Sequence, residues 1–227
     1  MKDLIRLSDA DLLQKALSLA PKRSTIKLSD VELNFLEWGD QEKPGLLFVH
    51  GGAAHAHWWS FIAPFFLPDY HCIAIDLSGH GDSVRRSEYA PELWHQEVFQ
   101  LANSDALFHS IPVIIGHSMG GLIGIRAAAV LGAALPGLII IDSAVRPDFP
   151  IHDRRRKSVN LLGKQRTYGS RQQILSHFRL VPPQGCKNTN ILQYIAAESI
   201  RAVDDHWTWK YDPHAFRDLQ PASIFGL

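Results

Sequence analysis

Residues 113–124 read VIIGHSMGGLIG, and this stretch decides how the rest of the chain is interpreted. A β-branched apolar run leads into the pentapeptide GHSMG (116–120), and a helical pattern follows it directly. Between a strand and a helix, G-x-S-x-G is the pattern of a nucleophile elbow, a sharp turn that exposes a serine Oγ above a sheet. The glycines are expected for steric reasons, because side chains at Gly116 and Gly120 would collide with the neighbouring strand or helix. Ser118 is therefore the candidate nucleophile.

Length and composition are those of an ordinary globular domain. The chain has 227 residues, of which 46% are hydrophobic and 20% charged, enough to bury a sizeable core. Lys+Arg and Asp+Glu number 23 each, so no excess charge favours nucleic acid or an anionic membrane as a partner. Cys72 and Cys186 are too few for a disulfide framework, which favours a reducing, cytoplasmic compartment. The acidic N-terminal segment has no long apolar core and resembles neither a signal peptide nor a membrane span.

Apolar strands that alternate with helical patterns predict an α/β fold. A short amphipathic helix (8–19) and an antiparallel hairpin (25–38) come first. The buried strands are expected at 46–49, 72–75, 113–115 and 138–141, with helical patterns at 58–66, 91–108 and 119–131 between them. This order predicts a mostly parallel sheet of about six strands with helices on both faces, and functional sites at the carboxyl ends of its strands.

Four motifs at these strand ends carry a resemblance to a known family. They are HGG (50–52), DLSGHGDS (76–83), GHSMGG (116–121) and IDS (141–143). As an ordered set they resemble the α/β-hydrolase superfamily, and most closely its small esterase, carbon–carbon hydrolase and haloperoxidase-like branch. The resemblance implies a three-layer α/β core with the N-terminal helix and hairpin at 1–145, a helical cap at 146–220, and a stub of the strand after the cap at 221–227.

The resemblance also implies a reaction. Ser118 would attack a small ester, thioester, amide or carbon–carbon substrate and form an acyl-enzyme, without a metal or other cofactor. The backbone N–H groups of Gly52 and Met119 would form the oxyanion hole. A serine at this position, rather than an aspartate, argues against the epoxide hydrolases and haloalkane dehalogenases of the family.

The acid and the base of a triad are harder to assign. In this family the chain order is Ser, then Asp or Glu, then His, with acid and histidine on strands after the cap. Because residues 221–227 match at most the first of those strands, we expect a C-terminally truncated fold without a counterpart of the usual histidine. Asp142 ends the strand after the nucleophile helix, where some branches carry their acid. It is the candidate acid, or else a residue that caps the next segment.

None of the 12 histidines is an evident base. His117 lies inside the elbow, and we expect its side chain to point away from the active rim. His50 is expected to support the turn that shapes the oxyanion hole. His206 and His214 fall in the cap region, where they either overhang Ser118 or pack within the cap.

Three further patterns have a simpler interpretation than a second site. His55 and His57 are expected at the mouth of a pocket rather than on a metal, because no third ligand follows them. The basic run at 154–157 is expected on a solvated helix face. The aromatic residues within 58–66 and 207–209 are expected either to line an apolar acyl pocket or to pack in the core.

Loss of the last strands would leave strand 138–141 as an exposed apolar edge. Such an edge pairs with other chains, so we expect self-association through it.

Two hypotheses of function follow. One is a serine hydrolase with a small-molecule substrate. The other is a catalytically incomplete hydrolase-fold protein, either a binding module or a gene remnant.

Overall fold

A computed structural model of the chain describes residues 8–143 and 165–216. Its six main strands are β1 (Lys22–Lys27), β2 (Glu32–Trp38), β3 (Gly45–Val49), β4 (His71–Ile75), β5 (Val113–His117) and β6 (Leu138–Ile141). They form one sheet in the order β1-β2-β4-β3-β5-β6. The β1/β2 and β2/β4 pairs are antiparallel, and the β4/β3, β3/β5 and β5/β6 pairs are parallel. The predicted α/β sheet of about six strands is confirmed.

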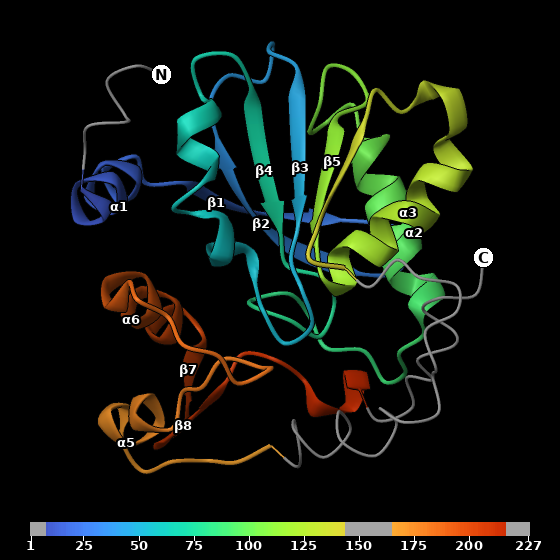
Figure 1. Ribbon diagram of the computed structural model, residues 1–227. Coiled ribbons are helices and arrows are strands. Elements are labelled where there is room, and N and C mark those ends of the chain that lie inside the picture. The colour runs from blue at the N-terminus through green and yellow to red at the C-terminus, as the bar shows by residue number, and fades with distance from the viewer. Residues whose placement is uncertain (1–7, 144–164, 217–227) are drawn as a thin grey trace.

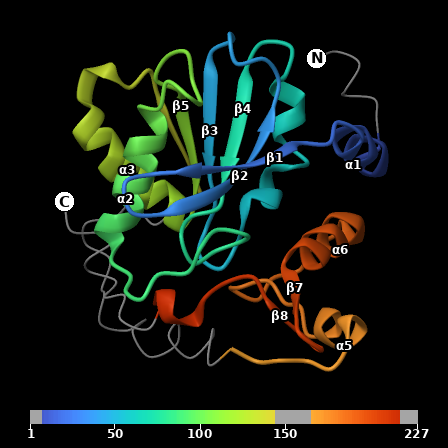
Figure 2. The same cartoon turned by 180° about the vertical axis from the view of Figure 1, so that it is seen from behind.

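Helices cover both faces of this sheet and make three layers. The two long helices α2 (Pro91–Ala102) and α3 (Met119–Leu131) lie together on one face. The other face carries α1 (Asp9–Ser18) and two short 3₁₀ helices, η2 (Ala56–Trp59) and η3 (Ala63–Phe66). Figures 1 and 2 show the same arrangement from opposite sides. The layers leave the carboxyl ends of the parallel strands uncovered by these helices, and the site lies there.

Strand β3 shows why the sheet is buried on both faces. Leu47 and Val49 belong to the apolar cluster under α2 and α3, whereas Leu46 and Phe48 belong to the cluster on the opposite face. Every residue of β3 is buried. Because successive side chains of a strand point to opposite faces, a continuous apolar run is what a doubly covered strand requires. Each such side chain contributes roughly 2 kcal/mol of hydrophobic free energy.

The N-terminal helix begins where the sequence predicts. Ser8 caps α1: its Oγ accepts a hydrogen bond from the Asp11 N–H at 3.2 Å, and the Asp11 carboxylate accepts one from the Ser8 N–H at 3.3 Å. These reciprocal bonds satisfy two backbone donors that a helix leaves free at its start. At the other end, the Trp38 indole N–H donates to the Leu19 carbonyl at 2.9 Å and ties the helix to the sheet.

Two predicted helices have other bounds in the structure. The helix expected at 91–108 ends at Ala102, because the chain turns at Asn103, whose side-chain amide donates to the Phe99 carbonyl at 2.8 Å. The helical segment expected at 58–66 is in fact two separate 3₁₀ turns, η2 and η3. A proline stands at the start of η3 and cannot donate the N–H that a continuous helix would need there.

The described residues 165–216, here called the cap segment, lie beyond the carboxyl ends of the parallel strands (Figure 1). They contain α5 (Arg171–Ser176), α6 (Thr189–Glu198), a hairpin of β7 (Ile200–Val203) and β8 (His206–Trp209), and the 3₁₀ helix η5 (Pro213–Phe216). Besides the helices expected of the cap at 146–220, this segment contains the hairpin, which forms a second, two-stranded sheet. The basic run at 154–157 and the predicted stub at 221–227 lie outside the described residues.

Strand β6 is the edge of the main sheet, and its side chains are exposed. Ile139 is 50% exposed and Ile141 41%. Ile140 faces α3, because a Cβ added to Gly121 would stand 3.0 Å from the Ile140 side chain. The apolar edge expected at 138–141 is thus present in the part of the chain that the structure describes. None of the helices in these ranges combines the length and hydropathy that crossing a bilayer requires.

Candidate functional site

Ser118 has the backbone conformation of a nucleophile elbow. It lies between β5 and α3 with φ +51° and ψ −115°, a region that non-glycine residues seldom occupy. Its N–H donates to the Ile141 carbonyl at 2.9 Å, and its carbonyl accepts a hydrogen bond from Ser143 Oγ at 2.8 Å. Both bonds attach the turn to the end of β6. The surrounding structure therefore holds a strained backbone in place.

The glycines of the elbow have the steric role that the sequence predicts. A Cβ on Gly116 would stand 2.4 Å from the Gly120 carbonyl oxygen. A Cβ on Gly120 would stand 2.4 Å from the Val49 carbonyl oxygen. No side chain fits at either distance, so the strand, the turn and the helix can approach this closely only with glycine at both positions.

His50 supports the turn that follows β3, as expected. Its Nε2 accepts a hydrogen bond from the Leu77 N–H at 3.1 Å, so the proton of the neutral ring must be on Nδ1. Nδ1 donates that proton to the Gly51 carbonyl at 2.7 Å. Burial lowers the pKa of His50 to about 4, so the ring stays neutral near pH 7. The two bonds fix the path of the Gly51–Gly52 backbone beside the elbow.

The two residues whose N–H groups are expected to form an oxyanion hole lie close to each other. A Cβ on Gly52 would stand 3.7 Å from Met119 Sδ and 3.2 Å from the Phe216 ring. Met119 is the first residue of α3, where backbone N–H groups have no partner within the helix. Across the described ranges, neither the Gly52 nor the Met119 N–H donates a backbone hydrogen bond. Their role as oxyanion donors stays a prediction.

A cleft of about 460 Å³ separates the elbow from the cap segment. Its core side is formed by residues 51–54, Trp58, His117 and Ser118, and its cap side includes Arg166, Tyr168, residues 177–181, Trp209 and Tyr211. Two of the expected aromatic residues, Trp58 and Trp209, line it. Trp59 instead packs in the apolar core against the sheet. The cleft thus has an apolar, partly aromatic wall with polar groups at several points.

His117 lines this cleft, so the expectation that it points away from the active rim is wrong. Its ring stacks on Trp58, with centroids 6.4 Å apart and an interplanar angle of 15°. Side-chain alternation along β5 explains this position: His117 falls on the same face as Ile115, and η2 covers that face. Burial lowers the pKa of His117, and the negative charge of Asp142 partly opposes this shift.

Asp142 directly follows β6 and is exposed. Its backbone is left-handed, with φ +48°. Within the described residues its carboxylate acts electrostatically on His117 rather than through a hydrogen bond. Its two open roles, triad acid and cap of the next segment, therefore both stay predictions.

The described residues bring no histidine into hydrogen-bond contact with Ser118 Oγ. His206 is exposed at the start of β8, and His214 lies on η5; neither belongs to the cleft lining. His177 does line the cleft, and the sequence carried no signal for it. Its Nδ1 donates to the Gln173 carbonyl at 2.8 Å, so the neutral ring has its lone pair on Nε2.

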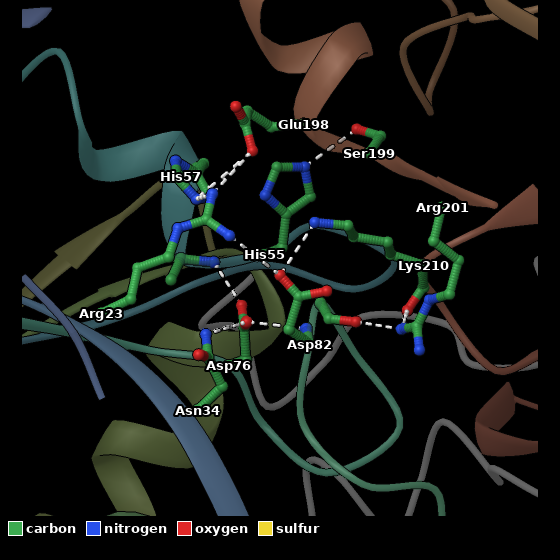
Figure 3. Close-up of polar contacts among 12 residues, drawn as sticks. Arg23, Asn34, His55, His57, Asp76, Asp82, Glu198, Ser199, Arg201 and Lys210 are labelled. Atoms are coloured by element: carbon green, nitrogen blue, oxygen red, sulfur yellow. Dashed lines mark hydrogen bonds and ion pairs between the residues drawn. The ribbon is translucent and has the colours of Figure 1, made fainter. Parts of the chain in front are cut away.

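A polar cluster joins the core to the cap segment beside the cleft (Figure 3). Asp76 is its buried centre. The carboxylate accepts hydrogen bonds from the Ala56 N–H at 2.6 Å, the Asn34 side-chain amide at 2.7 Å and the Asp82 N–H at 2.8 Å. Burial raises the pKa of Asp76, and these three donors oppose that shift. Asp76 thereby holds the loops after β3 and β4 together.

His55 and His57 belong to this cluster, and not to the mouth of the cleft as expected. Both are buried. His55 Nε2 lies 2.9 Å from Ser199 Oγ, and His57 Nδ1 lies 2.8 Å from the hydroxyl of Tyr194. His57 Nε2 is also 3.4 Å from the Glu198 carboxylate. The two histidines therefore attach the loop after β3 to α6 and its C-terminal end.

Ion pairs extend the same contact. Lys210 Nζ lies 2.8 Å from the Asp82 carboxylate, and an Arg23 nitrogen lies 3.1 Å from the Glu198 carboxylate. Arg201 donates to the backbone carbonyls of Gly81 and Lys210. Figure 3 shows these cations between β1, the loop after β4 and the hairpin.

Comparison with known proteins agrees with this geometry. The model of the alpha/beta hydrolase family matches residues 46–225. The esterase Rv0045c of Mycobacterium tuberculosis is 28% identical over 187 residues, which cover 79% of this chain and 60% of that protein. Protein phosphatase methylesterase 1 of Mus musculus is 37% identical over 109 residues, which cover 44% of this chain and 28% of that protein.

A solved structure of the Mycobacterium tuberculosis esterase Rv0045c superimposes with a TM-score of 0.64 at 25% identity, covering 93% of this chain and 72% of that one. Of the two curated relatives named above, the matched part of this chain spans less than two thirds of the length of each. The match to the family model extends over most of the chain, from the β3 strand through the elbow and the cap segment. The chain belongs to the α/β-hydrolase family.

Proposed function

We propose that this chain carries the nucleophile and the oxyanion donors of a serine hydrolase that cleaves small carboxylic esters. The observation that carries the proposal is the left-handed backbone of Ser118 at the wall of a cleft, with the Gly52 and Met119 N–H groups nearby. A strained serine at a strand–helix turn is costly to maintain unless its position is used. The esterase and methylesterase relatives support an ester as substrate.

The reaction would proceed through an acyl-enzyme. Ser118 Oγ attacks the ester carbonyl, and its proton passes to a base. The carbonyl oxygen becomes an oxyanion that accepts hydrogen bonds from the N–H groups of Gly52 and Met119. One such donor typically contributes about 10²–10³ in rate. The alcohol leaves with the proton, and water then releases the acid by the same steps in reverse.

The base is the open part of this mechanism. His117 and His177 are the described histidines that line the cleft, and neither hydrogen-bonds Ser118 Oγ. This observation favours a second candidate function, a hydrolase-fold binding module without turnover. In that case Ser118 would be an inherited residue and the cleft would bind a small molecule.

Labelling with a fluorophosphonate separates the two functions. We expect the folded chain to gain one phosphonyl group, measured by intact mass, and Ser118→Ala to gain none. Ser176→Ala, an exposed serine on α5, is the matched control and should label like the wild type. Turnover of a p-nitrophenyl ester by the labelling-competent chain would support the hydrolase. A folded chain that never labels would contradict the proposal and leave the binding module.

A further inference from the structure

We infer that the cleft selects esters that carry an anionic group, a carboxylate or a phosphate, and that Arg166 and Arg179 of the cap segment bind this anion. The inference rests on the proposed function and adds a substrate class to it. Ser118 lies on the core side of the cleft, and both arginines lie on the cap side. The ester and the anion would therefore occupy opposite walls.

The charge of the cleft lining is one-sided. Arg166 and Arg179 line the cleft, and no described lining residue is an aspartate or glutamate. An excess of one sign of charge in a concave site raises the local concentration of ligands of opposite charge. The net formal charge of the whole chain is zero, so this excess belongs to the cleft and not to the protein as a whole.

Four cations of the described structure outside the cleft, Lys22, Arg23, Arg86 and Lys210, have carboxylate partners. Lys210 pairs with Asp82, and Arg23 pairs with both Asp82 and Glu198. Arg86 pairs with two carboxylates, at 2.6 and 3.0 Å. In such a pair the carboxylate neutralises the cation, so the cation attracts a ligand anion less strongly.

The two cleft arginines differ from these cations. Neither Arg166 nor Arg179 forms an ion pair with a described carboxylate. One terminal nitrogen of Arg179 donates to the carbonyls of Ser176 at 2.9 Å and Phe178 at 2.6 Å, which fixes the guanidinium at the end of α5. A fixed guanidinium with further N–H groups matches the geometry of carboxylate and phosphate oxygens.

Apolar side chains of the cleft lining bear on the part of the ligand that joins the ester to the anion. Trp58, Phe178 and Val181 are among the apolar residues that line the same cleft as Ser118 and the two arginines. A hydrocarbon spacer in the ligand would be buried against these side chains. The ligands that suit such a cleft are accordingly an ester and an anion joined by a hydrocarbon spacer.

Binding to the Ser118→Ala chain tests this inference without turnover. Three ligands share a methyl ester and a propylene spacer and differ at the far end: monomethyl glutarate, methyl 4-phosphonobutanoate and methyl pentanoate. By calorimetry at low salt we expect at least one anion to bind roughly ten-fold more tightly than the neutral ester. The two anionic ligands distinguish a carboxylate from a phosphate preference.

Variants then assign the preference to the two arginines. Arg166→Gln/Arg179→Gln should bring the anion-to-neutral affinity ratio close to one while leaving the affinity for methyl pentanoate unchanged. Replacement of both by lysine should restore part of the ratio. Arg171→Gln, an exposed α5 arginine outside the cleft lining, is the matched control and should keep the full ratio.

Two results would overturn the inference: equal affinity for all three ligands, or an unchanged ratio in the double glutamine variant. Either result leaves the fluorophosphonate outcome untouched, because that probe reads the reactivity of Ser118. Conversely, a chain that prefers anions but never labels would retain this inference as a binding specificity while the hydrolase proposal fails.

Discussion

Gly120 lies so close to Val49 that a Cβ built on the glycine would stand 2.4 Å from the valine carbonyl oxygen. Val49 is the last residue of β3, and Gly120 is in the first turn of α3. The elbow thus packs against the end of β3 through backbone contacts. Its geometry depends on the packing of the core and not on the cap segment.

Gly120→Ala should therefore destabilise the fold. The added methyl group meets backbone atoms that cannot rotate away, and we expect the free energy of unfolding to fall by about 2 kcal/mol or more. Gly124→Ala in the same helix is the control: its Cβ would meet a mobile Leu138 methyl group at 2.9 Å, and alanine gains about 1 kcal/mol of helix propensity. Urea unfolding of both variants tests this. Equal losses would show that the contact with Val49 is not limiting.

Asp76→Asn should weaken the contact between the loops and the cap segment. The carboxylate accepts from three N–H donors, and an amide would place its own NH₂ group against at least one of them. We expect a loss of about 1–3 kcal/mol in the free energy of unfolding at pH 7. Exposed Asp69→Asn should change it by less than about 0.5 kcal/mol. A stability for Asp76→Asn within that same range would contradict the role of Asp76 as the centre of the cluster.

Buried histidines should make the fold sensitive to acid. Burial lowers the pKa of His80 from 6.5 to about 3 and that of His50 to about 4. Below pH 6.5 the unfolded chain binds protons at these rings and the native chain does not. The free energy of unfolding therefore falls as the pH falls from 6.5 toward 4, by up to about 1.4 kcal/mol per pH unit for each histidine.

His80→Gln should remove one of these contributions. Between pH 6 and 4.5 its stability should fall less steeply than that of the wild type, by roughly 1 kcal/mol per pH unit. The control His206→Gln changes an exposed ring and should keep the wild-type slope. Urea unfolding at several pH values gives the slopes. Parallel curves for His80→Gln and the wild type would refute the assignment.

The edge strand β6 should mediate self-association of the chain. Ile139 is exposed, and among the described residues β6 pairs with β5 alone, so a second copy can add its own β6 and extend the sheet. Sedimentation velocity should show concentration-dependent association that Ile139→Lys reduces. Val130→Lys, which charges a 70% exposed position on α3, should leave association unchanged. A wild-type chain that stays monomeric across the concentration series would contradict this prediction.

Local sequence patterns predicted most of the core. The continuous apolar run of β3 predicts a doubly covered strand, and the glycines at 116 and 120 around Ser118 predict an elbow, because both patterns can be recognised within a few residues of sequence. The role of His50 followed from the resemblance to the family.

Contacts between distant segments could not be predicted in this way. His55 meets Ser199, a residue 144 positions away, and no local pattern distinguishes such a buried pair from two histidines at a pocket mouth. The orientation of His117 depends on whether η2 covers that face. His177 reaches the cleft only because the cap segment lies over the strand ends. The hairpin β7–β8 is short, and its sequence reads equally well as part of a helical cap.

Among the contacts that attach the cap segment to the core, two kinds respond in opposite ways to ionic strength. At one end, Ala215 and Phe216 pack into the apolar cluster under α2 and α3, and sulfate strengthens such packing. At the other end, the Arg23–Glu198 and Lys210–Asp82 pairs hold the helices and hairpin, and salt screens charge pairs of this kind. Added salt should therefore weaken the contact of α6 with the core while η5 stays packed. The cap segment would then move about η5 as a hinge. Protease cleavage near α6 that rises with sodium chloride, while the sites around η5 stay protected, would report this motion.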